Sequence, residues 1–182
     1  QNIDPSEERY EAYYRKLVEL DLPLLTHVGD EDSFSQTNNA LGDPKLLRFA
    51  LECGVKVTAA HVASSGEREG QTNVERLLEM MPEFPNLAAD ISTLTQSNRR
   101  KYLPVVLNDK RLEGRLMYGT DYPLTNTPLV TPLQYPLNLK LGQMWKIFRT
   151  KNSWDRDVQL KAALGTKRDV FEMSREYLGI KN

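Results

Sequence analysis

The fold of this chain is decided by a short apolar stretch, Val55-Lys56-Val57-Thr58-Ala59-Ala60, which follows a glycine and ends at a histidine. The stretch is too short for a buried helix of ordinary length, so we interpret it as a strand buried on both faces. Three similar apolar stretches occur in the chain. The first residues of the four stretches, taken in order, lie 31, 32 and 28 residues apart. The predicted strands are residues 24–28, 55–60, 87–91 and 115–118.

Helical patterns lie between these strands and after the last one. The expected helices cover residues 4–17, 43–54, 74–81, 98–107, 139–149, 157–164 and 167–178. A repeat of about 30 residues is the size of a βαβ unit, which predicts a parallel α/β sheet. Two architectures fit this pattern, an open doubly wound sheet and a stretch of (β/α)8 barrel. Prolines break up residues 124–139, where we expect an irregular loop, and no linker divides residues 1–182 into two domains.

Composition excludes several classes of function. The 182 residues carry 24 Lys and Arg against 25 Asp and Glu, a formal net charge of -1. This balance gives no electrostatic reason to bind nucleic acid or anionic lipid. No apolar run approaches the roughly 20 residues that cross a bilayer. The single cysteine, Cys53, cannot form an internal disulfide, so we expect a cytoplasmic protein.

The chemistry is predicted at the carboxyl ends of the strands, where ligands bind in parallel α/β folds. The chain has only two histidines, and both follow predicted strands: His27 after the first and His61 after the second. Asp90 ends the third strand, and Asp121 follows the fourth. Histidine nitrogens and carboxylate oxygens are the ligands that zinc takes in proteins, and bound zinc lowers the pKa of its water to about 7.

Each of these residues also has a structural interpretation. A single histidine at the end of a buried strand is often a hydrogen-bonded structural residue. Asp90 can cap the following loop through Ser92 or Thr93, and Asp121 precedes Tyr122-Pro123, where aspartate is a common turn residue. The placement of both histidines together with Asp121 favours a site. The glycine-rich motifs GxGxxG and GxxxxGK[ST] do not occur, so no nucleotide cofactor is predicted.

Four ordered motifs resemble the later strands of the amidohydrolase superfamily, and most closely its branch of amidohydrolase-related metal-dependent hydrolases. They are Pro23-Leu24-Leu25-Thr26-His27-Val28-Gly29, Gly54-Val55-Lys56-Val57-Thr58-Ala59-Ala60-His61, Asn86-Leu87-Ala88-Ala89-Asp90-Ile91-Ser92 and Arg115-Leu116-Met117-Tyr118-Gly119-Thr120-Asp121-Tyr122-Pro123. The resemblance covers nearly the whole chain. It implies strands five to eight of a (β/α)8 barrel, with carboxyl-terminal helices.

The resemblance also implies roles for the residues that match. His27 corresponds to the metal-ligand histidine of strand five, and His61 to the histidine of strand six, which assists the reacting carbonyl or binds a second metal. Asp121 corresponds to the aspartate of strand eight, which binds the metal and takes the proton from its water. Asp90 would lie near the pocket, behind the ligands. The expected activity is hydrolysis of a C–N or ester bond of a small molecule.

One departure from the family is large. The His-x-His pair of strand one has no counterpart in this sequence, and neither do strands one to four. We therefore expect a carboxyl-terminal portion of a longer enzyme, inactive or weakly metal-binding alone, that pairs with the missing amino-terminal half or with another copy. The alternatives are decarboxylation of a small carboxylic acid by the same family, or a non-catalytic α/β interaction module.

Overall fold

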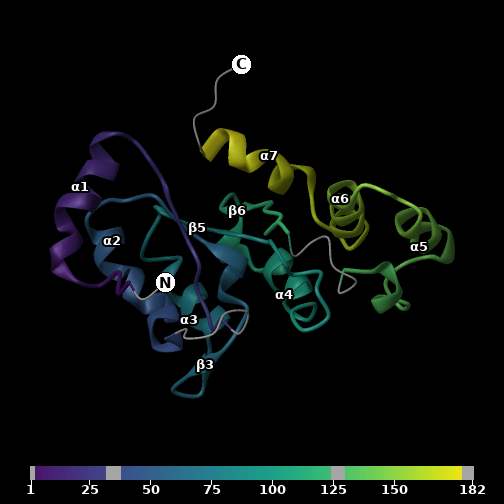
Figure 1. Cartoon of the computed structure of the whole chain (residues 1–182), viewed down its shortest axis with the longest axis horizontal. Helices are drawn as coiled ribbons and strands as arrows, with labels where there is room; N and C mark the ends of the chain where they lie inside the picture. Colours follow the sequence, from purple (N-terminus) through teal and green to yellow (C-terminus); the bar gives the residue numbers. More distant parts are fainter. Residues whose placement is uncertain (1–2, 32–37, 124–129, 178–182) are drawn as a thin grey trace.

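A parallel four-stranded sheet forms the centre of the molecule in the computed structural model, which describes residues 3–31, 38–123 and 130–177 (Figure 1). The strands are β1 (Leu24–Thr26), β2 (Val57–Ala59), β5 (Leu87–Asp90) and β6 (Leu116–Met117), and they lie side by side in that order. Every adjacent pair is parallel, with Leu24 opposite Val57, Val57 opposite Leu87, and Ala89 opposite Leu116. The predicted strands and the parallel α/β class are therefore confirmed.

Helices overlap every predicted helical segment. They are α1 (Glu11–Glu19), α2 (Arg48–Glu52), α3 (Asn73–Met80), α4 (Tyr102–Asn108), α5 (Leu141–Phe148), α6 (Ser153–Ala163) and α7 (Arg168–Tyr177). Short 3-10 turns precede α1 and α2, at Glu8–Tyr10 and Pro44–Leu47. Pro104 is tolerated in α4 because it is the third residue of the helix, and the first backbone N–H groups of a helix have no partner within it.

A small antiparallel hairpin between β2 and α3 was not predicted. It pairs β3 (Glu67–Arg68) with β4 (Gln71–Thr72). Its two central residues, Glu69 and Gly70, have φ of 54° and 78°, the left-handed values that a tight two-residue hairpin turn requires. The paired segments are too short to carry an alternating apolar pattern, so the sequence contains no strand signal there.

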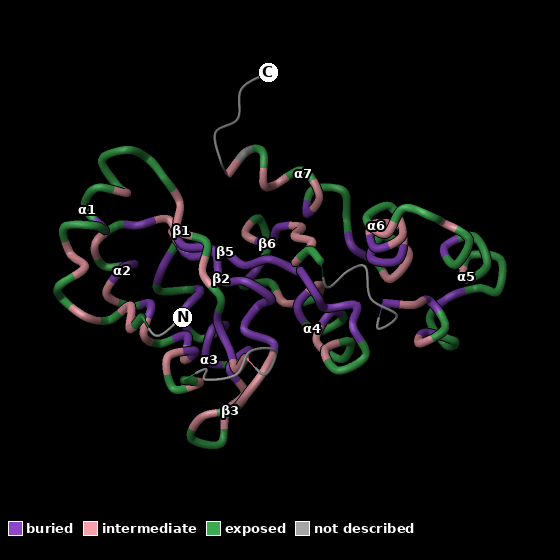
Figure 2. Tube along the Cα trace, in the orientation of Figure 1, coloured by how far each residue is buried: buried purple, intermediate pink, exposed green. Residues whose placement is uncertain are grey.

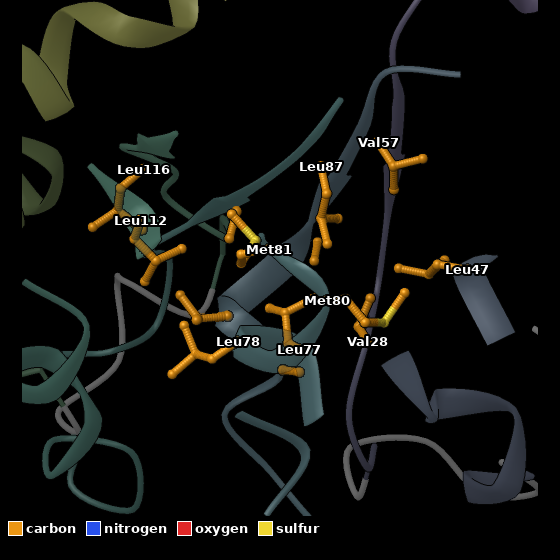
Figure 3. Close-up of a cluster of buried hydrophobic side chains, with 14 of the residues drawn as sticks. Val28, Leu47, Val57, Leu77, Leu78, Met80, Met81, Leu87, Leu112 and Leu116 are labelled. Carbon is orange, nitrogen blue, oxygen red and sulfur yellow. The ribbon is translucent and has the colours of Figure 1, made fainter. Parts of the chain in front are cut away.

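The main core lies between the sheet and the helices, and α3 contributes much of it. All residues of β2 and β5 are buried, as Figure 2 shows along both strands. Figure 3 shows Val57 and Leu87 of these strands clustered with Leu77 of α3, and all three are fully buried. Burying a Val or Leu side chain contributes about 1.5–3 kcal/mol, which accounts for the apolar runs that mark these strands in the sequence.

The first strand differs from the prediction. We expected residues 24–28 to be buried on both faces, but Leu25 in the middle of β1 is 67% exposed. β1 lies at an edge of the sheet and pairs only with β2 among the described residues, and no described element covers Leu25. At the other edge, β6 is buried because α7 packs against it. The prediction of burial on both faces is therefore correct for β2, β5 and β6 and wrong for β1.

The carboxyl-terminal helices form a second, smaller core beyond β6. Its buried residues are Val130, Tyr135, Leu139, Ile147 and Leu160. Helix α7 lies against β6 and accepts a backbone hydrogen bond of 2.9 Å from Tyr118 N through Val170 O (Figure 1). In residues 130–139 the structure contains only a 3-10 turn at Pro132–Gln134, as expected for the irregular loop; residues 124–129 lie outside the described part. None of the helices described is long and apolar enough to span a membrane.

Candidate functional site

His61 is the centre of the candidate site, because each of the other predicted site residues contacts it. The His27 and His61 rings lie 5.3 Å apart between centroids. Asp121 Oδ2 lies 3.9 Å from His61 Nε2, and Asp90 Oδ1 accepts a 2.9 Å hydrogen bond from the backbone N–H of His61. The structure thus brings His27, His61, Asp90 and Asp121 together at the carboxyl ends of the strands.

The backbone immediately after β2 is strained. His61, Val62 and Ala63 have φ of 57°, 49° and 51°, in the left-handed region that residues other than glycine seldom occupy. Such a conformation costs roughly 1–3 kcal/mol per residue and persists only where the surroundings enforce it. Asp121 has φ of 50° as well. Left-handed backbone therefore occurs at both His61 and Asp121, whose side chains face each other across the site.

A hydrogen-bonded chain fixes the protonation of the His61 ring. Ser92 Oγ lies 2.7 Å from His61 Nδ1 and donates its own proton to Asp90 Oδ1, which also accepts from Ser92 N at 3.0 Å. Because the single hydroxyl proton of Ser92 goes to the carboxylate, Ser92 Oγ must accept from His61 Nδ1–H. The lone pair of the neutral ring is then on Nε2, which faces Asp121. Sequence reasoning missed this role of Ser92, whose only signal was its position two residues after Asp90.

Burial keeps His61 neutral. The residue is only 6% exposed, and this desolvation lowers the pKa of His61 below its ordinary value. The charges of Asp90 and Asp121 oppose the shift, whereas Arg99 and His27 add to it. A neutral imidazole with its lone pair on Nε2 can accept a proton from a reacting group or bind a metal ion.

Gly119 brings the segment after β6 close to the end of β5. A Cβ atom at this position would lie 3.1 Å from Ser92 Cβ and 3.2 Å from Asp90 Cγ, closer than ordinary van der Waals contact. Any side chain at residue 119 would therefore push the Asp121 segment away from Asp90 and Ser92. The segment that carries Asp121 therefore packs directly against Asp90 and Ser92, which hydrogen-bond to His61.

His27 has a carboxylate neighbour, Glu31, that the sequence did not indicate. Glu31 Oε2 lies 3.8 Å from His27 Nδ1, with the Glu31 side chain 22% exposed. The loop that carries Glu31 folds back because Gly29 donates a 2.8 Å hydrogen bond to Gly42 O. The two glycines are in such close contact that a Cβ on Gly42 would lie 2.8 Å from the Gly29 carbonyl carbon.

This contact gives a prediction about the loop after β1. Gly42→Ala is expected to lower the free energy of unfolding by about 3 kcal/mol, at the upper end of the usual cost of overpacking, because backbone rather than a flexible side chain must move. The measurement is urea unfolding. Gly142→Ala is the matched control: it lies in α5 with nothing within 4 Å of its added methyl, and should stabilise by about 0.5–1 kcal/mol. Equal unfolding midpoints for the two variants would contradict the prediction.

A buried ion pair lies behind the site on α6, where the sequence predicted only a helix. Lys161 and Asp157 are both 0% exposed, and Lys161 Nζ lies 2.7 Å from Asp157 Oδ2. Asp157 also accepts hydrogen bonds from Thr95 Oγ1 at 2.7 Å and from Tyr118 Oη at 3.1 Å. Burial lowers the pKa of Lys161, an effect that the charge of Asp157 opposes. A lysine four residues after an aspartate is typical of a solvated helix face, so nothing in the sequence indicated that Asp157 and Lys161 are buried.

Among the described residues, the structure does not show the predicted zinc site. Within residues 3–31, 38–123 and 130–177, no group of three or more His, Cys, Asp or Glu side chains is arranged to hold a metal ion. Two ligand atoms of one tetrahedral zinc would lie about 3.4 Å apart at the usual bond lengths. His61 Nε2 and Asp121 Oδ2, at 3.9 Å, are somewhat farther apart. His27, His61 and Asp121, from which the sequence predicts a zinc site, are therefore not arranged as a metal site in the described part of the chain.

Comparisons with known proteins identify a family and a similar fold. The family model described as amidohydrolase matches residues 1–148. The fold is similar to that of a crystal structure from Pseudomonas putida whose proposed identity is a 2-pyrone-4,6-dicarboxylic acid hydrolase, with a TM-score of 0.56 and 18% identity. The alignment covers 100% of this chain and 60% of that one, so this chain spans less than two thirds of the solved structure.

No protein of curated function matches the chain significantly. At 18% identity, the likeness to the Pseudomonas structure shows the fold alone. That fold is the parallel βα arrangement of an amidohydrolase barrel, which confirms the predicted class. The family model covers well over half of the sequence, and its matched region contains His27, His61, Asp90 and Asp121. The chain belongs to the amidohydrolase superfamily.

Proposed function

We propose that the protein containing this chain hydrolyses an ester or C–N bond of a small molecule, with Asp121 and His61 activating the attacking water. The observation that carries the proposal is the pair of acceptors that face each other, His61 Nε2 and Asp121 Oδ2, 3.9 Å apart. Both atoms hold lone pairs, because the hydrogen bond to Ser92 keeps the His61 proton on Nδ1. A water molecule can donate one proton to each of them.

The reaction follows from this arrangement. The Asp121 carboxylate takes a proton from the water while the water oxygen attacks the carbonyl carbon of the substrate. His61 Nε2 accepts a hydrogen bond from the second O–H of the same water, and this bond orients the water. The bond from the carbonyl carbon to the leaving oxygen or nitrogen then breaks, and Asp121 returns its proton to the leaving atom. A general acid–base of this kind contributes typically 10²–10⁴-fold to the rate.

We also propose that the protein binds a divalent metal, zinc in the first instance, at this edge of the sheet. The residue types His27, His61 and Asp121 support it, as does membership of the superfamily. When bound, the ion would polarise the substrate carbonyl and increase the acidity of water. The described residues do not complete its ligand set, so the steps above assign no role to the metal.

The partner that completes the site is proposed to be an amino-terminal half barrel or a second copy of this chain. Two observations support this. In the described part of the chain β1 and β6 each pair with a single neighbour, and Leu25 on β1 is largely exposed. The solved structure is longer than the region to which this chain aligns. Exposed strand edges with apolar side chains favour pairing with another strand.

The test uses the full-length protein, purified with and without added zinc, and a panel of lactones, esters and amides that includes 2-pyrone-4,6-dicarboxylate. We expect hydrolysis without release of carbon dioxide, and loss of both bound metal and turnover in His27→Ala and Asp121→Ala. Glu172→Ala, on the exposed face of α7, is the control and should keep both. Unchanged metal content and turnover in the two site variants would refute the assignment, and release of carbon dioxide would show a decarboxylase instead.

A further inference from the structure

Lys161 is the most deeply buried cation outside the proposed reaction among the residues that the structure describes, and its ammonium faces the segment that leads to Asp121. The residue is 0% exposed. Its Nζ contacts Asp157 at 2.7 Å, the carbonyl oxygen of Gly119 at 3.4 Å, and the face of the Tyr118 ring at 4.8 Å from the centroid. Two of these contacts are with consecutive residues at the end of β6, which connect that strand to the site.

A buried ion pair needs an explanation other than stability. Removing two charges from water costs several kcal/mol per ion, and replacing such a pair by apolar residues is often neutral or stabilising. The Lys161 and Asp157 pair therefore contributes little net stability by itself. What the pair does provide is a set of directional contacts in a fully enclosed position, and these contacts can hold one backbone arrangement in preference to others.

The backbone that Lys161 contacts is held on several sides. Tyr118 Oη donates to Asp157 Oδ2 at 3.1 Å, and Tyr118 N donates to Val170 O of α7 at 2.9 Å. Gly119 lies so close to Asp90 and Ser92 that a Cβ would crowd both side chains. Residues 118 and 119 are thus fixed between α6, α7 and the end of β5, and the next two residues lead directly to the Asp121 side chain.

We infer that Lys161 is a positioning residue for the reaction: its ammonium, held by Asp157, fixes the Gly119 carbonyl and thereby sets the separation of Asp121 Oδ2 from His61 Nε2. Lys161 does not touch the reacting atoms, since its contacts are with Asp157, Gly119 and Tyr118. A misplacement of about 1 Å in a catalytic group can lower the rate about 100-fold, which sets the size of the expected effect. The inference rests on the proposed function, in which Asp121 and His61 act on the same water.

The experiment must separate positioning from simple support of the fold. Lys161→Met alone leaves Asp157 buried without its cation and can fail to fold. The double variant Lys161→Met/Asp157→Asn removes both charges, and the amide oxygen of the new asparagine can still accept from Thr95 Oγ1. The matched control is Arg76→Met/Asp43→Asn. It removes another ion pair, with Arg76 buried and Arg76 Nη2 2.6 Å from Asp43 Oδ2, where Asp43 caps the turn before α2. The hydrogen bonds of these two side chains are with each other, Glu69 and Lys45.

Three measurements are made on the full-length protein: urea unfolding, kcat and KM determined separately, and the ¹H–¹⁵N amide resonances of residues 119–121. We expect the Lys161/Asp157 double variant to keep the unfolding midpoint within the range of the Arg76/Asp43 control. Its kcat should fall about 100-fold with KM nearly unchanged. Its amide resonances at residues 119–121 should shift or broaden, whereas the control should keep wild-type kcat and wild-type resonances there.

The inference is overturned if the Lys161/Asp157 double variant keeps wild-type kcat and wild-type amide resonances at residues 119–121. It is also overturned if the Arg76/Asp43 control loses as much kcat, because the loss would then reflect general destabilisation. If the wild-type protein hydrolyses nothing in the panel, the proposed function fails. The resonances of residues 119–121 then decide the positioning role by themselves.

Discussion

Asp121→Asn is expected to lower kcat for hydrolysis about 10²–10⁴-fold, the contribution typical of a positioned general base. The amide is nearly the same size as the carboxylate, but it cannot take a proton from water. Asparagine also tolerates the left-handed backbone of residue 121, where φ is 50°, so the substitution should leave the fold intact. We therefore expect the chemical step to slow, so that kcat falls while KM stays nearly unchanged.

The control for this substitution is Asp21→Asn. Asp21 also has a left-handed backbone, with φ of 51°, but its side chain is 78% exposed and pairs with Lys56 on the surface. The Asp21→Asn variant should retain wild-type kcat, and its unfolding midpoint should change by no more than that of Asp121→Asn. Steady-state kinetics on the full-length protein measures both variants. If Asp121→Asn keeps more than about a tenth of wild-type kcat, Asp121 is not the base, and His61 becomes the candidate.

The central strands could be predicted from the sequence because their apolar residues are continuous. Val57 and Leu87 lie in strands covered on both sides, and uninterrupted apolar runs are typical of such strands. β1 shows why the same reasoning has a limit. Its sequence resembles that of a covered strand, yet Leu25 is exposed, because a strand pattern indicates which side chains favour burial and cannot indicate whether a neighbouring strand is present.

The positions of the site residues were predictable from topology. Parallel strands end at the same edge of a sheet, so His27, His61, Asp90 and Asp121 had to lie near one another once the strand order was known. The contacts between them were not predictable. Ser92 sets the tautomer of His61 because the left-handed backbone after β2 places the His61 ring against Ser92. No sequence pattern predicts that backbone conformation.

The surroundings of the site were the hardest part to predict, because they depend on contacts between distant segments. Asp157 receives a hydrogen bond from Thr95, 62 residues earlier in the chain, and Lys161 reaches Gly119, 42 residues earlier. Considered alone, Asp157 and Lys161 form an ordinary helical ion pair of the kind found on solvated surfaces. Only the packing of α6 against the end of β6 buries both charges.

That burial makes Lys161→Met a strongly destabilising substitution. Removing one partner of a buried ion pair typically costs 3–5 kcal/mol, because the other charge stays buried without compensation. Asp157 would keep its hydrogen bonds from Thr95 and Tyr118, so we expect a loss of about 3 kcal/mol in the free energy of unfolding, at the lower end of this range. Urea unfolding at neutral pH measures it.

The control is Lys45→Met, which removes a lysine whose side chain is 45% exposed and whose Nζ lies 3.7 Å from Glu79. An exposed pair of this kind contributes less than about 1 kcal/mol, so this variant should unfold almost like the wild type. Adding Asp157→Asn to Lys161→Met should then recover most of the lost stability, because no charge remains buried. A Lys161→Met variant as stable as Lys45→Met would mean that water or another cation reaches Asp157, and that α6 does not enclose the pair as the structure has it.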